Sequence, residues 1–453
     1  MYDFTIIGAG VTGCSIAREL SKYKTDVSIL EKSNDVATGA SKANSGIIHG
    51  GYAAKHGTLK GKLNVLGNRQ FERLNQNLNF GYKKTGALVL GFTEEDLASL
   101  KLLFENGLKN GVKDIRIIDN EEIKRLEPNL NQSVKYALYT GDVGVTSPYE
   151  YTIALAENAV SNGAELFLNN EVLNIVKKEN SFDVITNSQT IKTRTIINAS
   201  GVYSDYISKM AGIDYFNIIP RKGQYILFQK GTGSAVNSVI FQVPTNKGKG
   251  ILVTSTYHGN LMLGPNSEEV RNREDNETDD ISLEYIIDAA RKSLPDFDTK
   301  KILKTFSGIR PTPSTGDFII KEEFPGFINV AGIESPGLTS SPAIADMVME
   351  IIKNRNNLEP DKNFNPKREA IIKPNSFDAV EVKRRIDLPP CNDRIICRCE
   401  KVTEGEIKDA LNRNIDVDTR KAVKMRTRAG MGVCQGKFCG PRVDDLINRM
   451  KNE

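Results

Sequence analysis

The sequence predicts an α/β protein: a Rossmann-like dinucleotide-binding domain, an α+β domain on an antiparallel sheet, and a small C-terminal helical module. Three observations support this prediction. The chain opens with a strand, a glycine-rich turn and a helix; its middle carries long β-rich runs; and five of its six cysteines fall in the last 63 residues. A length of 453 residues suffices for two or three domains.

Composition excludes several classes of protein. Hydrophobic residues make up 39% and charged residues 26%, and no low-complexity tract occurs, so the chain is expected to be globular rather than disordered. No apolar run approaches the length of a membrane span. Lys and Arg number 61 against 57 Asp and Glu, and a net charge of +4 does not indicate nucleic-acid binding.

The N-terminus and the cysteines favour a cytoplasmic location, with contact at the inner face of the membrane left open. Met1 is followed at once by an apolar strand pattern, without the charged and apolar regions of a signal peptide. A secreted disulfide framework would not confine its cysteines to one end of the chain. Clustered thiols in a reducing compartment indicate a metal site instead.

The first elements follow from periodicity. Residues 4–7 predict a strand, residues 8–13 a tight turn, residues 14–23 a helix and residues 27–30 a second strand, which together form a βαβ unit. Helices are expected at 61–78 and 94–110, strands within 162–201 and 215–265, and, from residue 327, a strand, a turn and a helix that begins near Pro342.

These patterns suggest a domain plan. The dinucleotide-binding domain is expected to combine residues 1–80, 146–215 and 325–356, and the substrate domain residues 81–145 and 216–324. The polar segment 357–390 lacks apolar periodicity and predicts a linker. The cysteine module occupies 391–453.

The turn carries a phosphate-binding motif. Gly8, Gly10 and Gly13 form GxGxxG between a strand and a helix, so backbone N–H groups can meet a pyrophosphate at the helix N-terminus. Glu31 ends the next strand, where its carboxylate suits a ribose hydroxyl pair. A dinucleotide is therefore predicted, although this motif alone does not separate FAD from NAD.

Several further segments carry a family resemblance. GASKANSGIIHGGY follows at 39–52, and later landmarks are NASGVYSD, RKGQYILF, VPTNKGKGILVTST, LGPN, SGIRP and AGIESPGLTSSPAIA. Together they resemble the D-amino-acid-oxidase-like superfamily of FAD-dependent oxidoreductases. Within it, the chain is similar to the glycerol-3-phosphate dehydrogenase/oxidase branch and, next to that, to L-2-hydroxyglutarate dehydrogenase.

The resemblance implies FAD and a set of FAD contacts. Beyond the glycine motif, the expected cofactor-binding residues are Ser41, Asn44, Ser45, Gly46, Val172, Gly201, Gly332, Gly337, Leu338 and Thr339. The helix near Pro342 is expected to direct its partial positive N-terminus at the flavin.

The chemistry at the substrate requires a base and cations. Flavin oxidation of a secondary alcohol sends a hydride to the flavin and the hydroxyl proton to a base. His49, flanked by two glycines, is the predicted base, whereas His56 and His258 are expected to be solvated. By resemblance, the expected cationic and polar substrate contacts are Lys249, Arg310, Arg221, Lys222 and Ser335.

Four cysteines near the C-terminus predict a second redox centre. Cys397 and Cys399 precede Cys434 and Cys439 by about one helix and its flanking loops, and four thiolates suit either a [2Fe-2S] cluster or zinc. The surroundings resemble the bacterioferritin-associated-ferredoxin-like [2Fe-2S] domain, which favours iron. Cys14 and Cys391 are expected to be structural thiols.

Together these features predict a dehydrogenase that oxidises sn-glycerol 3-phosphate and passes electrons through the cluster to a partner protein or another acceptor. L-2-hydroxyglutarate or another 2-hydroxy acid remains an alternative substrate, because two cations suit either the phosphate or the distal carboxylate of hydroxyglutarate. A non-catalytic electron-relay subunit is a further alternative. Oxidation of amino or imino acids is less favoured, since a substrate amine would want an acidic partner.

Overall fold

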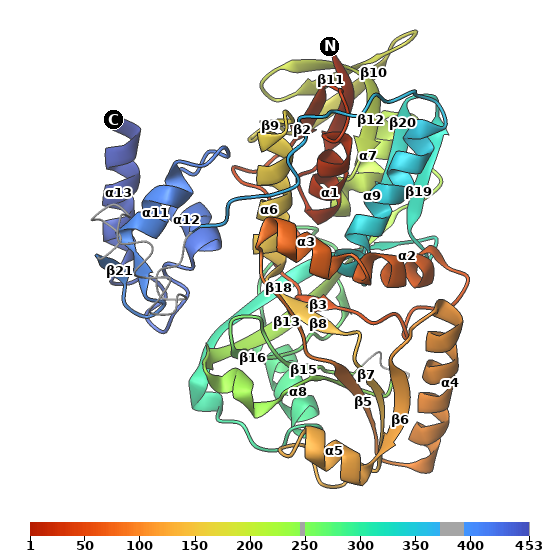
Figure 1. Ribbon diagram of the computed structural model, residues 1–453, viewed down its shortest axis with the longest axis vertical. Helices are drawn as coiled ribbons and strands as arrows, with labels where there is room; N and C mark the ends of the chain where they lie inside the picture. Colours follow the sequence, from red (N-terminus) through yellow and green to blue (C-terminus); the bar gives the residue numbers. More distant parts are fainter. Residues whose placement is uncertain (245–249, 372–393, 453) are drawn as a thin grey trace. The chain divides into compact units, whose positions relative to one another are not determined.

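The computed structural model describes residues 1–244, 250–371 and 394–452, and it divides into two compact units, Met1–Pro366 and Lys367–Glu453. Figure 1 shows the first unit with one sheet in its upper half and another in its lower half, and the second unit in blue.

The upper sheet of the first unit is built around parallel strands in the order β9–β2–β1–β12–β20. The hairpin β10–β11 pairs with the first half of β12, and β19 pairs antiparallel with β20. Strand β2 is buried along its whole length, as parallel strands covered on both faces are. The bounds are β1 Tyr2–Ile7, β2 Val27–Leu30, β9 Glu165–Phe167, β10 Val172–Lys177, β11 Phe182–Thr186, β12 Thr190–Asn198, β19 Ile319–Phe324 and β20 Phe327–Ala331.

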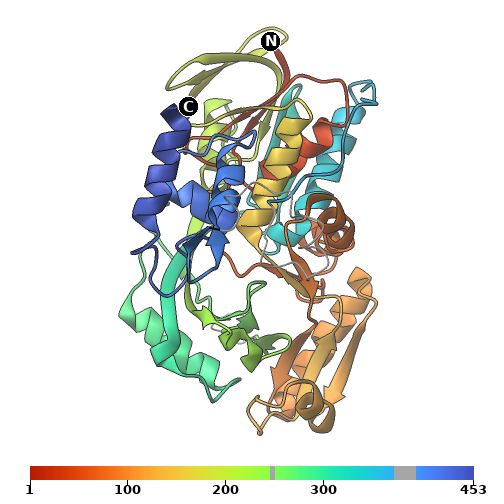
Figure 2. The ribbon, with the colours of Figure 1, turned by 60° about the vertical axis from the view of Figure 1, so that its left-hand side comes forward.

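Helices α1 (Val11–Leu20), α6 (Pro148–Ser161) and α9 (Gly337–Lys353) pack against one another beside this sheet, as Figures 1 and 2 show. Helix α1 starts three residues before the predicted position, because the helix begins at the glycine turn itself. The short helix α7 (Ser204–Met210) contacts β10, β12 and β20. The parallel sheet and the α1 crossover confirm the predicted Rossmann-like unit.

The start of α9 corrects the sequence prediction. The helix begins at Gly337, five residues before the expected Pro342, which lies inside it. A proline removes one backbone donor, so the Leu338 carbonyl would be left without its helical partner. The Ser341 hydroxyl donates to that carbonyl at 2.9 Å and replaces the missing bond.

The lower sheet runs in the order β17–β13–β16–β15–β14–β5–β7–β6, with β18 along the other edge of β13. Its pairs are antiparallel as predicted, except that β14 and β5 are parallel. Bounds are β5 Ala87–Gly91, β6 Ile115–Asp119, β7 Tyr136–Thr140, β13 Ile218–Lys230, β14 Val239–Gln242, β15 Val253–Ser255, β16 Asn260–Leu263, β17 Glu268–Glu269 and β18 Ile302–Pro313.

Helix α4 (Glu94–Asn110) has the predicted bounds and ends at Gly111, whose φ of 87° a glycine adopts without strain. Other helical segments of the described chain are α5 (Asn120–Leu126), α8 (Asp280–Arg291) and the short 3₁₀ turns Gly201–Tyr203, Thr232–Ala235 and Thr299–Lys301. A small sheet joins β3 (Ile47–Ile48), β8 (Gly144–Thr146) and β4 (Tyr82–Lys84).

The helix predicted over 61–78 is two helices, α2 (Leu59–Asn68) and α3 (Phe71–Leu78). Different partners explain the break. Helix α2 packs on α9, where a Cβ on Gly67 would lie 2.1 Å from the Thr339 carbonyl oxygen. Helix α3 instead packs on α6, with Phe71 at a ring-centroid distance of 5.0 Å from Tyr151.

The first part of the predicted linker lies along the end of α1. The Lys24 N–H donates to the Glu359 carbonyl at 2.9 Å, and the Asp361 N–H donates to the Lys22 carbonyl at 2.8 Å. Residues 372–390 of that prediction lie outside the described residues. Within the described chain, no helix is long and apolar enough to cross a membrane.

The second unit is a small module with its own apolar core. It contains β21 (Ile395–Cys397), β22 (Val402–Thr403), α11 (Glu404–Leu411), α12 (Arg420–Thr427) and α13 (Gly440–Asn452). Thr403 and Glu406 form a capping box that starts α11. Ile407 and Val423 are fully buried in the core and hold the helices together.

Candidate active site and redox module

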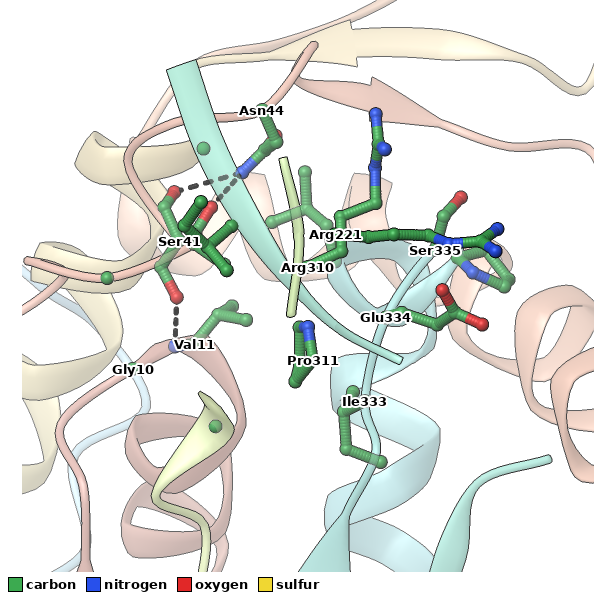
Figure 3. Close-up of a pocket in the computed structure, with 18 of the residues that line it drawn as sticks. Gly10, Val11, Ser41, Asn44, Arg221, Arg310, Pro311, Ile333, Glu334 and Ser335 are labelled. Carbon is green, nitrogen blue, oxygen red and sulfur yellow. Dashed lines mark hydrogen bonds between the residues drawn. The ribbon is translucent and has the colours of Figure 1, made fainter. Parts of the chain in front are cut away.

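The first unit contains a cavity of about 1380 Å³ that is lined from both sheets, α1, α9 and the loop 38–46. Pockets for a drug-sized ligand typically measure about 300–1,000 Å³, so this cavity has room for a dinucleotide together with a small substrate. In Figure 3, Gly10, Val11 and Ser41 lie together in one part of it, and Arg221, Arg310 and Ser335 in another.

The glycine turn leaves no room for side chains. Gly8 has a φ of 107°, and a Cβ there would lie 2.6 Å from the Ala199 carbonyl oxygen. A Cβ on Gly13 would lie 2.0 Å from the Gly8 carbonyl oxygen. Gly10 caps α1 without a side-chain hydrogen bond, and no acidic residue lies in the first turn. The helix therefore presents N–H groups and a partial positive charge to the cavity.

Two side chains fix the loops around this turn. Buried Glu31 accepts hydrogen bonds from the backbone N–H of Ala9 at 2.9 Å and of Ser33 at 3.0 Å, which holds its carboxylate at the cavity wall. The Ser41 hydroxyl oxygen accepts from the Val11 N–H at 2.8 Å. Its own hydrogen thus remains able to donate to a phosphate oxygen.

Helix α9 directs a second N-terminus toward the cavity. Gly337 and Leu338, its first two residues, line the wall, and the preceding Pro336 gives no side-chain cap. The first turn of α9 also lacks acidic residues. Two helix N-termini facing one cavity suit an anionic ligand that extends between them.

Most predicted site residues meet at this cavity: Gly8, Gly10, Glu31, Ser41, Asn44, Ser45, His49, Val172, Gly201, Arg221, Arg310, Ser335, Gly337 and Leu338. Gly13, Gly46, Gly332 and Thr339 lie behind the wall; for instance, a Cβ on Gly46 would lie 2.3 Å from the Thr146 carbonyl oxygen. Their role in the structure is close packing of the loops. Lys249 lies outside the described residues.

His49 lines the cavity directly after β3, and three neighbours hold its backbone. The His49 N–H donates to the buried Thr339 hydroxyl at 2.9 Å. The His49 carbonyl accepts from Asn68 Nδ2 at 3.1 Å and, with the amide of Asn64 turned to satisfy its neighbours, from that amide at 3.2 Å. The centroid of the His49 imidazole ring lies 6.1 Å from the centroid of the Phe241 ring. Helices α2 and α9 thus fix its position.

Arg221 and Arg310 are direct cross-strand neighbours on β13 and β18. Arg310 Nη2 donates to the Asn266 carbonyl at 3.1 Å, and a Cβ on Gly223 would lie 2.3 Å from that nitrogen. No ion pair with a carboxylate joins either guanidinium among the described residues. Burial raises the pKa of the adjacent Tyr225, an effect that Arg310 partly offsets.

The structure does not bring Lys222 to the cavity. Successive residues of a strand face opposite sides, so Lys222 lies on the other side of β13 from Arg221. Its Nζ is 2.9 Å from an Asp275 carboxylate oxygen, and its side chain is only 9% exposed. The prediction that Lys222 contacts substrate is therefore not supported by its placement.

Sequence reasoning missed several lining residues. Tyr225 follows Arg221 by four positions on the same face of β13. The alternation of side chains along a strand would therefore have predicted that Tyr225 lines the cavity. Lys60 and Glu334 also line the cavity, with Nζ and Oε1 2.7 Å apart, and Thr312 donates to the other Glu334 oxygen at 2.8 Å. Because these residues come from distant segments, no local pattern in the sequence indicates them.

The histidines assigned to solvent differ from each other. His56 is exposed, and its Nδ1 lies 3.1 Å from Asn110 Oδ1. His258 is half-buried instead, with Nε2 3.1 Å from a Glu150 carboxylate oxygen, and thus corrects the prediction. The thiol of Cys14 is buried and donates to the Ala9 carbonyl at 3.4 Å.

The four thiols of the second unit lie in two neighbouring pairs. Cys399 Sγ and Cys434 Sγ are 3.7 Å apart, and Cys439 interacts with Cys397. Backbone N–H groups, that of Phe438 most strongly, lower the pKa of Cys434 from its ordinary value of 9.0. Burial raises the pKa of Cys439 to about 12, and Cys397 adds to this rise.

The backbone approaches these sulfurs closely. The Gly430 N–H donates to Cys397 Sγ at 3.5 Å, and a Cβ on Gly432 would lie 2.2 Å from the Cys399 Cβ. This arrangement of thiols and glycine amides fits a cluster held by four thiolates. In the described part of the chain, no three His, Cys, Asp or Glu side chains converge as they would around a single ion. Cys391 lies outside the described residues.

Comparison with known families identifies both units. Residues 3–351 match the FAD dependent oxidoreductase family. The chain belongs to this family. Residues 395–449 match the BFD-like [2Fe-2S] binding domain, so the oxidoreductase carries both an FAD-binding unit and an iron–sulfur module. These matches confirm the cofactors that the sequence predicted.

Three relatives place this oxidoreductase more closely. It is 47% identical to a glycerol 3-phosphate dehydrogenase of Caloramator mitchellensis over 99% of this chain and 94% of that protein. The structure of a dithionite-reduced L-α-glycerophosphate oxidase from Mycoplasma pneumoniae with FAD bound has a TM-score of 0.77 and 32% identity, covering 81% of this chain and 98% of that one. A mitochondrial L-2-hydroxyglutarate dehydrogenase of Arabidopsis thaliana is 27% identical over 76% of this chain and 82% of that protein.

The described residues fit FAD at the cavity of this oxidoreductase. The crowded glycines leave space for backbone contact with a pyrophosphate, and Glu31 is anchored at the end of β2, where a ribose is expected. Ser41 and the first turn of α1 supply donors for phosphate oxygens. The first turn of α9 supplies further N–H groups at the same cavity.

Proposed function

We propose that this oxidoreductase converts sn-glycerol 3-phosphate to dihydroxyacetone phosphate. The observation that supports this proposal most is the pair Arg221 and Arg310, two cross-strand guanidinium groups without a carboxylate partner in the described chain, at the cavity that His49 also lines. This arrangement offers a site for a dianion beside a proton acceptor.

The cation pair has a cost that a ligand would offset. Like charges directly opposite each other on neighbouring strands destabilise a sheet. A phosphate dianion supplies two negative charges and several acceptor oxygens, and guanidinium groups bind such oxygens in a fork geometry. Arg310 is half-buried and additionally held by the Asn266 carbonyl, so we assign it the larger part of phosphate binding.

His49 is the proposed acceptor of the hydroxyl proton. Bound FAD supplies the acceptor for the hydride that leaves the carbinol carbon. The imidazole takes the proton as the carbonyl forms, a role that histidine side chains serve in general base catalysis. Thr339, Asn68 and Asn64 hold the backbone of His49 in place, so the ring can keep a fixed direction during this step.

The iron–sulfur module supports a dehydrogenase rather than an oxidase. The glycerophosphate oxidase structure is matched over 98% of its own length yet covers only 81% of this chain, whereas the relative named a dehydrogenase covers 99%. We propose that electrons leave through the [2Fe-2S] cluster to a separate acceptor. Free thiols at the cluster ligands are consistent with a reducing compartment such as the cytoplasm.

Anaerobic titration tests the substrate. The holoenzyme is mixed with sn-glycerol 3-phosphate or with L-2-hydroxyglutarate in the absence of oxygen, and the visible absorption of the flavin is followed. We expect glycerol 3-phosphate to bleach the flavin and L-2-hydroxyglutarate to leave it oxidised. Bleaching by L-2-hydroxyglutarate alone would establish the second candidate, whose distal carboxylate could occupy the same arginine pair.

The same titration addresses an electron-relay role. A relay subunit would be reduced by dithionite but by neither substrate, and His49→Ala would then leave its electron transfer intact. The proposed function instead predicts that His49→Ala slows substrate-dependent bleaching about 100-fold or more while dithionite reduces the flavin normally.

A further inference from the structure

The second unit carries an excess of positive charge. Between residues 394 and 452 there are 14 Lys and Arg against 8 Asp and Glu, a net charge of +6, although the whole chain has only +4. The rest of the chain is therefore close to neutral or slightly acidic. A basic module on such a chain suggests that its charge serves an interaction.

Most acidic residues of this unit are already used within it. Ion pairs join Glu400 to Arg428, Glu404 to Arg394 and Lys408, Asp409 to Arg413, Asp444 to Arg420, and Asp445 to Arg449. Glu406 closes the capping box of α11. Exposed cations for which the described residues show no ion pair include Lys421 and Lys451, and three more that stand beside cysteines in the sequence, Arg398, Lys437 and Arg442.

These three cations all adjoin cysteines of the cluster. Arg398 stands between Cys397 and Cys399, Lys437 lies between Cys434 and Cys439, and Arg442 follows Cys439 by three residues. Because the four thiols lie close together, residues that adjoin them in the sequence belong to the part of the unit from which electrons would leave. The paired charges of the unit are instead mostly on its helices.

Two large apolar side chains are exposed at the same place. Phe438 is 75% exposed and precedes Cys439, and Val433 is 61% exposed and precedes Cys434. The module buries most of its other apolar side chains in a core, although Ile395 is also 44% exposed. An exposed aromatic residue with charged residues beside it in the sequence is typical of a protein interface.

We propose that Arg398, Val433, Lys437, Phe438 and Arg442, here called the cysteine surface, dock an acidic one-electron carrier protein. Charge complementarity selects this occupant: three unpaired cations would attract carboxylates, and Phe438 would be covered at the centre of the contact. This inference rests on the proposed function, because it describes where the electrons taken from the substrate leave the enzyme.

The electron balance requires two encounters for each substrate. Oxidation of one alcohol to a ketone releases two electrons and two protons. A [2Fe-2S] cluster held by the four cysteines would pass on one electron at a time, so two oxidised carriers would be reduced for each molecule of product, and the protons would go to water. The carrier itself is the oxidant, and nothing else needs to be supplied.

Charge compensation of the cluster by these cations would be a different role. Cations that serve only the cluster would shift its reduction potential, and their replacement would not depend on the charge of the carrier. Cations that steer a partner change its association rate and affinity, and the effect decreases as salt screens it. Phe438 carries no charge, so the docking role alone predicts a large effect from its replacement.

The test uses the full-length holoenzyme and two carriers of similar size, an acidic soluble cytochrome b5 domain and a basic cytochrome c. Affinity is measured by calorimetry with oxidised carriers, and carrier reduction by absorbance after addition of sn-glycerol 3-phosphate. The variants are Lys437→Glu and Phe438→Ser. Matched controls are Lys101→Glu and Leu102→Ser on α4, which make the same changes at exposed positions of the first unit.

We expect the acidic carrier to bind, and both variants to weaken its binding about 10-fold at low salt while both controls do not. The difference should shrink as ionic strength rises for K437E and persist for F438S. Cluster absorbance and anaerobic flavin bleaching should equal those of the wild type. If K437E loses cluster absorbance, K437Q replaces it, with a smaller effect expected in the same direction.

Three results would overturn the proposal: equal binding by the variants and the controls, a preference for the basic carrier, or a shift of cluster potential as the sole effect of K437E. Binding of anionic phospholipid vesicles that K437E abolishes, with no binding of the acidic carrier, would assign the surface to a membrane instead. Flavin bleaching by substrate needs no carrier, so failure of docking is distinguishable from failure of the proposed function.

Discussion

Replacing Arg310 with methionine separates substrate binding from folding. The variant loses a guanidinium that we place on the substrate phosphate, and hydrogen bonds to charged groups are worth about 1.5–3 kcal/mol, with more lost when a charge is left unpaired. A loss of about 2–4 kcal/mol corresponds to a fall in kcat/KM of about 30- to 1000-fold. The fall should appear mainly in KM, because the phosphate is remote from the reacting carbon.

The same replacement of Arg310 should change the stability of the fold much less than it changes substrate binding. Removal of Arg310 also removes its repulsion with Arg221, which is worth about 0.2–1 kcal/mol and offsets its bond to the Asn266 carbonyl. The free energy of unfolding of R310M in urea should therefore stay within about 1 kcal/mol of the wild type.

Lys222→Met is the matched control for R310M. It removes a cation from the adjacent strand position on the opposite face, where Lys222 is paired with Asp275. We expect K222M to keep its KM and to lose about 1–2 kcal/mol of stability, because the partly exposed Asp275 is left without its partner. Steady-state kinetics with a dye acceptor and urea unfolding measure both quantities. A larger rise in KM for K222M than for R310M would refute the assignment of the two faces.

Further predictions follow from single contacts. Asn68→Ala should lower kcat about 10-fold with an unchanged KM in the same assay, because it frees the carbonyl of the proposed base. Gly13→Ala should abolish FAD incorporation, seen as protein without flavin absorbance, since its Cβ would lie 2.0 Å from a carbonyl oxygen. Burial alone would raise the pKa of Asp205, but hydrogen bonds from Arg273 lower this pKa below its ordinary value of 3.8. The contribution of Asp205 to the free energy of unfolding is therefore complete above about pH 4 and is lost as the pH falls through the pKa of the folded state. Urea unfolding of Asp205→Asn should lack this pH dependence. Cys434→Ser should lose iron, measured by metal analysis, and keep anaerobic bleaching of the flavin by substrate.

Local signals made the cofactor sites predictable from the sequence. In the GxGxxG turn, Gly8 and Gly13 must be glycines because a Cβ there would lie 2.6 Å and 2.0 Å from a carbonyl oxygen. The motif that meets this requirement is six consecutive residues long. The cysteines are equally local, since their ligand spacing and the glycines beside them lie in two short segments. In both cases the motif lies in short segments of sequence, although the contacts that it makes in the fold reach further, as from Gly8 to Ala199 and from Cys399 to Cys434.

Long-range contacts set the features that the sequence did not reveal. The break between α2 and α3 follows from their different partners, α9 and α6, which are far away in the chain. The start of α9 depended on Ser341, whose hydroxyl replaces the backbone donor that Pro342 lacks. The positions of Asn64 and Asn68 behind His49 became visible only once α2 was placed beside β3.

The assignment of Lys222 shows a further reason. Arg221 and Lys222 are adjacent cations in a motif of the resembled family, and neither charge nor proximity tells them apart. The period of two along β13 does, because Arg221 and Tyr225 share the face that meets the cavity, and Lys222 meets Asp275 behind it. To decide which of the two cations faces the cavity, the pairing of β13 with β18 must be known, and a single sequence does not give this pairing.

In this protein the ion pairs, rather than the net charge, indicate which cations are available to bind an anion. A net charge of +4 on 453 residues indicates nothing about ligands. Six cations of the second unit, Arg394, Lys408, Arg413, Arg420, Arg428 and Arg449, are paired with a carboxylate. A paired cation has little attraction left for a ligand. The cations without such a partner in the described chain include Arg221 and Arg310 at the cavity and Lys437 beside the cysteines. Each lies where the proposed reaction needs an anion, a phosphate in one unit and an acidic carrier in the other, so unpaired charge marks both the entry and the exit of the electrons.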